Sequence, residues 1–365
     1  MTATVSPVAP AGVEIRRRRP EDGEALLSMY AGIFGQGEAE ASRRRFRWQY
    51  EENPHCPPEG PEIWVACEGG ELLGQYATMP VRLKVADRVV RASWGMDVMV
   101  KPGIQRKGVG SRLFLYWDRQ VEASLGLGLS ESSYSLFKKL QWKDVGPVPC
   151  YTRLLDVKAL LARRLGKLAA LLAPPAGLLL SFAFPARKAT PSAEAVRVEP
   201  LEGSFGPAFD RLWERAAPGY DFVVERSAGY LEWKYRRVPF VSYEIFQAVS
   251  GGEVSGYLVA RVVERPPLRL GLLVDLLAHP QDEASLDALL DQAVRWGRER
   301  RVARLQAFSL DRRLGARLRR KGFFEIGSPM QFCLKINTGH LDENFYRDTS
   351  RWHVTFGDSD QDRSS

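Results

Sequence analysis

The two halves of the sequence carry the same succession of short motifs, and this duplication constrains the fold more than any other feature. FRWQYEENP at residues 46–54 corresponds to LEWKYRRVP at residues 231–239; both contain Trp-x-Tyr and a Pro four residues after the Tyr. IWVACEGGELLGQYA then matches YEIFQAVSGGEVSGYLVA, GMDVMVKP matches LLVDLLAHP, and LFKKLQWKDVG matches RLRRKGFFEIG. Four matches in one order predict a duplicated unit of about 140 residues, an ordinary domain size.

Each unit has the same predicted order of elements: an opening strand, a helix, a hairpin, then strand, helix, strand, helix and strand. The hairpin turns contain Gly-Gly, at 69–70 and 251–252, and tight turns of this kind require positive φ. Helices that alternate with strands indicate a mixed α/β (α+β) fold.

The predicted boundaries follow from the repeat. We expect a disordered N-terminus (1–12), a first domain (13–156), a linker (157–194), a second domain (195–338) and a C-terminal tail (339–365). The linker contains seventeen uncharged residues (168–184) with basic flanks, too short to span a bilayer and interrupted by Pro-Pro. The favoured interpretation is a pair of short helices at the domain junction; the alternative is weak contact with an anionic membrane surface.

Composition excludes several functional classes. The net charge of +8 favours anionic partners, but the basic residues are spread along the chain and no nucleic-acid-binding motif is present, so we expect no nucleic-acid partner. The four cysteines lack Cys-x-x-Cys spacing, which predicts no metal site. Sparse cysteines and an N-terminus unlike a signal peptide predict a cytoplasmic protein.

The segment VMVKPGIQRKGVGS, at residues 98–111, is the strongest candidate site. An apolar strand runs into a loop with Gly103, Gly108 and Gly110, and an amphipathic helix follows at once. Free backbone amides at a helix N-terminus bind anions, and basic side chains add charge, so a pyrophosphate is the expected ligand. Neither the P-loop motif nor the dinucleotide Gly-x-Gly-x-x-Gly order is present.

This segment resembles the acetyl-CoA signature of the GNAT superfamily of acyl-CoA N-acyltransferases, Gln/Arg-x-x-Gly-x-Gly/Ala. The resemblance covers residues 14 to about 156, and more weakly the second unit, so the chain is similar to tandem GNAT proteins. It implies two GNAT-like domains, each a mixed, mostly antiparallel central sheet flanked by helices. The tail RWHVTFGDSDQD resembles the ending of GNAT proteins from bacterial exopolysaccharide clusters.

The resemblance also implies cofactor contacts. The loop would hold the CoA pyrophosphate and the strand edge would pair with the pantetheine arm, while SYSLFKKLQWKDVG would supply further contacts. The implied acetyl-CoA-binding residues are Val98, Met99, Val100, Gln105, Arg106, Lys107, Gly108, Val109, Gly110, Ser111, Ser133 and Phe137.

The catalytic candidates are Asp97, as the base, and Tyr134, as the acid that protonates the thiolate. Strand alternation leaves the direction of Asp97 open, and a packing role for it is the alternative. Phe137 stands where the family pattern has Tyr, so Tyr134 or Tyr151 would substitute, or the thiolate would leave unprotonated. Trp48 and Tyr50 are candidate substrate-binding residues, but their repetition in the second unit favours a shared core role.

In the second unit the corresponding segment reads AHPQDEASLDALL; it has no glycine, and two adjacent acidic residues, Asp282 and Glu283, stand in the loop. It would repel a pyrophosphate, so we expect only the first unit to bind CoA. The leading hypothesis is an acetyl-CoA-dependent N-acetyltransferase acting on a primary amine of a small molecule or saccharide precursor. The alternatives are a non-catalytic acyl-CoA-binding scaffold and a peripheral membrane assembly factor. The sequence predicts no oligomeric state.

Overall fold

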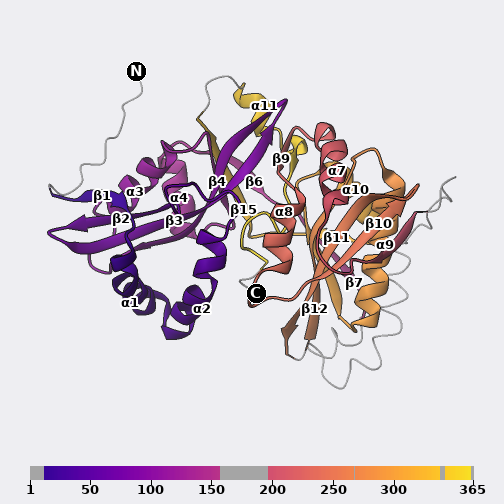
Figure 1. The fold of residues 1–365 in the computed structure, drawn as a ribbon, viewed down its shortest axis with the longest axis horizontal. Helices are drawn as coiled ribbons and strands as arrows, with labels where there is room; N and C mark the ends of the chain where they lie inside the picture. The colour runs from indigo at the N-terminus through magenta and orange to yellow at the C-terminus, as the bar shows by residue number, and fades with distance from the viewer. Residues whose placement is uncertain (1–11, 157–195, 267, 338–341, 363–365) are drawn as a thin grey trace.

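The fold consists of two twisted β-sheets side by side, each flanked by helices (Figure 1). The computed structural model describes residues 12–156, 196–266, 268–337 and 342–362. The apolar stretch 168–184 lies outside these residues. Within the described ranges, no helix is long and apolar enough to cross a membrane.

The first sheet has the strand order β1-β2-β3-β4-β5-β15-β6, and only the β4–β5 pair is parallel along this path. The far end of β3 also pairs with β9, which in turn pairs with β16. The strands are β1 Glu14–Arg17, β2 Ile63–Glu68, β3 Glu71–Val85, β4 Arg88–Val100, β5 Ala123–Leu127, β6 Lys143–Pro147, β9 Phe222–Val224, β15 Gln331–Ile336 and β16 Trp352–His353.

The second sheet repeats this arrangement in the order β8-β10-β11-β12-β13-β7-β14, again with one parallel pair, β12–β13. The strands are β7 Cys150–Leu154, β8 Arg197–Pro200, β10 Glu244–Ser250, β11 Glu253–Arg265, β12 Leu268–Ala278, β13 Arg304–Phe308 and β14 Phe324–Ile326. The mixed, mostly antiparallel architecture with tandem domains is confirmed.

The two sheets exchange strands. β7 is the last strand of the first unit in the sequence but pairs with β13 and β14 of the second sheet. β15 is the last strand of the second unit but lies between β5 and β6 of the first sheet. Both strands occupy the corresponding position in their new sheet, so each sheet is completed by the other half of the chain.

Helices cover both faces of each sheet. On the first sheet, α1 and α2 pack on the face of Val65 and Met99, whereas α3 and α4 pack on the face of Trp64 and Val98 (Figure 1). The helices are α1 Gly23–Phe34, α2 Gln36–Phe46, α3 Val109–Asp118, α4 Glu131–Lys139, α7 Pro207–Ala216, α8 Ala228–Leu231, α9 Glu283–Glu299, α10 Arg312–Arg320 and α11 Glu343–Arg347. Single π-helical turns follow α2 (Arg47–Glu51) and α8 (Glu232–Arg236).

The predicted hairpins are both present. β2 and β3 are joined by Gly69 and Gly70, with φ of 56° and 86°; β10 and β11 are joined by Gly251 and Gly252, with φ of 57° and 81°. Side chains other than glycine are disfavoured at positive φ, so the Gly-Gly pairs fix these tight turns.

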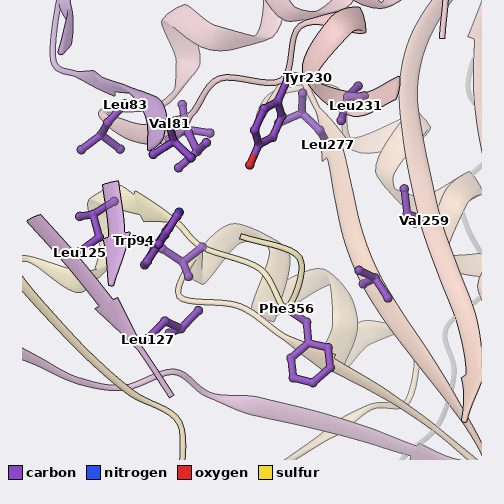
Figure 2. Close-up of a cluster of buried hydrophobic side chains, with 14 of the residues drawn as sticks. Val81, Leu83, Trp94, Leu125, Leu127, Tyr230, Leu231, Val259, Leu277 and Phe356 are labelled. Atoms are coloured by element: carbon purple, nitrogen blue, oxygen red, sulfur yellow. The ribbon is translucent and has the colours of Figure 1, made fainter. Parts of the chain in front are cut away.

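The Trp-x-Tyr repeats meet at the junction of the two units. Trp48 and Trp233 stack with ring centroids 5.0 Å apart. Each indole Nε1 donates to the backbone carbonyl of the other tryptophan, at 2.7 and 2.8 Å. One hydrophobic core extends across this junction, with side chains such as Trp94 and Tyr230 contributed by different units (Figure 2). The two units therefore fold against each other through a symmetric contact.

Candidate acyl-CoA site

The glycine loop between β4 and α3 has the backbone of an anion-binding loop. Gly103, Arg106 and Gly108 all have positive φ, of 88°, 66° and 85°, and Gly108 is the N-cap of α3. Alternation of right- and left-handed residues turns successive N–H groups toward the same side of a loop. Arg106 holds this conformation without being glycine, which is uncommon and typical of functional loops.

The first turn of α3 leaves its amides unpaired. Among the described residues, no acceptor pairs with the backbone N–H of Val109, Gly110 or Ser111. Arg106 and Lys107 are exposed and make no ion pair within the described ranges. Gln105 donates its side-chain amide to the Val100 carbonyl at 3.3 Å. The loop therefore offers amide donors and two positive charges at the N-terminal end of the helix dipole.

The strand before the loop has an unpaired edge. β4 pairs with β5 only at residues 92–94, so the two parallel strands separate beyond Trp94. On its other side β4 stays paired with β3, through Val98, Met99 and Val100. An extended ligand can add to such an edge as a further strand. The predicted pantetheine-binding residues therefore lie on an open edge that leads directly to the glycine loop.

A bulge in β4 decides the direction of Asp97. Met96 and Asp97 both stand opposite Ala77, since the register shifts between Tyr76 and Thr78. Asp97 and Met99 consequently face α1 and α2, where they line a pocket of about 210 Å³ together with Gln75 and Tyr50. The pocket lies on the face opposite α3, next to the unpaired edge of β4.

Three side chains hold the Asp97 carboxylate in this pocket. Tyr50 Oη donates to Asp97 Oδ2 at 2.7 Å, while Arg45 Nη2 and Tyr30 Oη approach Oδ1 at 3.3 and 3.5 Å. Burial, with the neighbouring Asp97 charge, raises the pKa of both tyrosines, so both stay protonated and donate. Arg45 compensates the charge of Asp97. The sequence did not indicate that Arg45 and Tyr30 contact Asp97, because no local pattern connects these helical residues to β4.

The structure separates the two predicted substrate-binding residues. Tyr50 lines the pocket at Asp97. Trp48 is 3% exposed and stacks on Trp233, so it lies in the core of the junction and has no open face for a substrate. This position agrees with the alternative prediction, in which the repeated tryptophans have a shared role in the core.

The α4 candidates also lie in different environments. Tyr134 is half-buried, and its hydroxyl donates to the Asp144 carboxylate on β6, a bond that raises the pKa of Tyr134 to about 12. Ser133 lies in the first turn of α4, where its N–H donates to Ser130. Phe137 is 1% exposed and packs against Trp142, so its ring has a packing role. Among the described residues, no group of His, Cys, Asp and Glu could hold a metal ion.

In the second unit a carboxylate occupies the equivalent of the anion site. Asp282 is the N-cap of α9, and its Oδ1 accepts the N–H of Ser285 at 2.9 Å. An acidic side chain at a helix N-terminus satisfies the free amides and repels a second anion. This geometry supports the prediction that the second unit lost the phosphate site.

The C-terminal tail fills the second unit's counterpart of the open edge. β12 and β13 separate after Leu273, and residues 354–357 lie between them. Gly357 N–H donates to Val274 O at 2.8 Å, and Leu310 N–H donates to Val354 O at 3.3 Å. Thr355 Oγ1 donates to Asp275, the counterpart of Asp97, at 3.0 Å. A cavity of only about 10 Å³ remains there, room for one water molecule.

Buried charges fasten the tail. Arg226 donates to Asp275 at 3.0 Å and to Asp358 at 2.7 Å, and all three side chains are at most 1% exposed. Tyr235 donates to Asp275 at 3.0 Å, which repeats the Tyr50–Asp97 bond of the first unit. The duplicated Tyr–Asp pair therefore faces a pocket in one unit and is sealed by the tail in the other.

The comparisons with known proteins agree with this geometry. A family model described as acetyltransferase (GNAT) domain matches residues 14–142. No curated protein matches the sequence significantly. Among solved structures, a GCN5-related N-acetyltransferase from Anabaena variabilis is 12% identical, with a TM-score of 0.62, over 89% of this chain and 73% of that one.

Two further structures have the same fold along most of the chain. Saccharomyces cerevisiae N-myristoyltransferase with bound myristoyl-CoA is 13% identical, with a TM-score of 0.55, over 96% of this chain and 92% of that one. A GCN5-related N-acetyltransferase from Kribbella flavida is 14% identical, with a TM-score of 0.53, over 89% and 71%. At these identities the similarity establishes the fold. The domain match shows an acetyltransferase (GNAT) domain at residues 14–142, and the chain as a whole has the fold of these structures.

Proposed function

We propose that the first unit binds acetyl-CoA and transfers the acyl group to a primary amine of a small molecule or saccharide precursor in the cytoplasm. One observation carries the proposal: the free amides of α3, the unpaired edge of β4 and the pocket at Asp97 all adjoin the same stretch, residues 95–111. The first two features suit the pyrophosphate and pantetheine of CoA, and the third supplies a place for the acceptor.

In this arrangement the pyrophosphate lies against the loop from Gln105 to Ser111, where Arg106 and Lys107 add charge. The pantetheine arm pairs with Val98 to Val100 and brings the thioester to the point where β4 and β5 separate. A backbone N–H near Met99 or Val100 would stabilise the oxyanion.

The chemistry consists of one bond exchange. A neutral amine attacks the thioester carbonyl carbon, a C–N bond forms and the C–S bond breaks. The proton released by the amine passes to Asp97, directly or through water, and the CoA thiolate takes up a proton. Tyr134 is the proposed donor, and its hydroxyl would have to leave its hydrogen bond with Asp144 to deliver the proton. Tyr50 and Arg45 are positioning residues that hold the Asp97 carboxylate.

A second function is favoured by a specific observation at α4. Phe137 occupies the position of the expected tyrosine, and the hydroxyl of Tyr134 is already engaged by Asp144. Both facts suit a protein that binds acyl-CoA without turning it over. Such a scaffold in polysaccharide biosynthesis is therefore the alternative proposal.

Thiol release from acetyl-CoA with a panel of amines separates the two functions. We expect release only when an amine is present, and a fall of about a hundredfold or more in kcat for Asp97→Asn. Arg106→Gln combined with Lys107→Gln should weaken acetyl-CoA binding, whereas Arg119→Gln, at the other end of α3, should not. Binding without thiol release for any amine would favour the scaffold; no binding would refute both functions.

A further inference from the structure

The pocket at Asp97 contains more positive charge than an amine site requires. Four charged side chains line it: Arg18, Glu24, Arg43 and Asp97. Arg45 already compensates Asp97, at 3.3 Å. Within the described ranges, Arg18 and Arg43 make no ion pair or side-chain hydrogen bond. Two guanidinium groups therefore line the pocket, and the described lining residues include one carboxylate besides Asp97, that of Glu24.

The two arginines come from elements other than β4. Arg43 is exposed on α2, and Arg18 follows β1 with its guanidinium 4.6 Å from the centre of the Phe46 ring. Asp97 and Tyr50, in contrast, are 15% and 3% exposed. The pocket therefore holds a half-buried carboxylate beside the unpaired edge of β4, and the half-buried Arg18 and the exposed Arg43 line it from other elements.

We propose that the acceptor amine carries an anionic group, a carboxylate or a phosphate, which Arg18 and Arg43 bind while the amine lies at Asp97. Guanidinium groups present planar pairs of N–H donors that match these oxyanions. The Phe46 ring under Arg18 holds the guanidinium in place, because cations are attracted to aromatic faces. The pocket of about 210 Å³ suits a small molecule. This inference rests on the proposed acyltransferase function.

To test this inference, calorimetry measures how tightly pairs of amines bind to the protein saturated with CoA; the two amines of a pair differ in the anionic group. Glucosamine 6-phosphate is compared with glucosamine, and β-alanine with propylamine. We expect the anionic member of at least one pair to bind about tenfold tighter or more. The pair that shows the preference identifies the group as phosphate or carboxylate.

Substitutions test whether Arg18 and Arg43 cause the preference for the anionic amine. Arg18→Gln and Arg43→Gln should each remove most of it, whereas Arg44→Gln should not, because Arg44 is exposed on the same helix and pairs with Glu40. In turnover with acetyl-CoA, the two pocket variants should raise KM for the anionic amine and leave kcat nearly unchanged.

Equal or absent binding within both pairs, or a preference that survives both pocket variants, would overturn the inference. CoA is titrated into the same preparations first. Failure of CoA to bind would refute the proposed function instead, so the two failures are distinguishable.

Discussion

The conformation of Gly108 gives a sharp test of the glycine loop. This residue is the N-cap of α3 with φ of 85° and ψ of −7°, a left-handed conformation. A Cβ in this region destabilises the backbone by about 1–2 kcal/mol. Gly108→Ala therefore places that amount of strain at the junction on which the helix amides depend.

This strain should lower either the free energy of unfolding or the affinity for CoA. If the loop keeps its conformation, the free energy of unfolding falls by about 1–2 kcal/mol. If the loop relaxes, CoA binding must restore the left-handed conformation, and affinity falls by roughly five- to thirtyfold. The two losses should together amount to the same 1–2 kcal/mol, measured by urea unfolding and by calorimetric titration of CoA.

Gly110→Ala is the matched control. Gly110 lies in the first turn of α3 without positive φ, and an added Cβ would meet only Val100 Cγ2, at an ordinary 3.6 Å. The acetyl-CoA motif also admits alanine at this position. We expect unchanged affinity and stability equal to or slightly above the parent. The reasoning is refuted if Gly108→Ala changes neither quantity, or if the control loses as much.

Three further predictions concern the rest of the fold. Trp48→Phe should lower the free energy of unfolding by about 1–3 kcal/mol in urea titrations, because the buried Trp233 carbonyl loses its donor; unchanged stability would contradict this. Asp144→Asn should return the pKa of Tyr134 from about 12 toward 10 in ultraviolet titrations read against Tyr134→Phe, because the neutral amide no longer favours the protonated phenol; an unaltered pKa would argue against the hydrogen bond. Arg226→Met leaves two buried carboxylates uncompensated and should destabilise the protein by about 3–5 kcal/mol in urea titrations, whereas a stable variant would show that the tail is fastened otherwise.

Local sequence signals predicted the parts of the fold that depend on local chemistry. The Gly-Gly pairs specified both hairpin turns, because positive φ at both positions is a property of the turn itself. The glycine spacing and basic residues likewise predicted the loop at the N-terminus of α3. The duplicated Trp-x-Tyr segments predicted equivalent positions in two units, and the structure brings them together.

Features set by long-range pairing were not predictable in this way. β7 and β15 each have the composition of an ordinary buried strand, so nothing within them indicates that they pair in the other unit's sheet. The direction of Asp97 depends on a bulge, which reverses simple strand alternation. The tail that seals the second unit reaches β12 from about 80 residues further along the chain.

We propose that one unit binds CoA and that its repeat does not. Calorimetric titration of the full chain with acetyl-CoA tests this directly. We predict a single site per chain that weakens when Arg106 and Lys107 are neutralised and persists in Asp282→Asn. Two sites per chain, or one site that responds to Asp282 and not to the Arg106–Lys107 pair, would contradict the account.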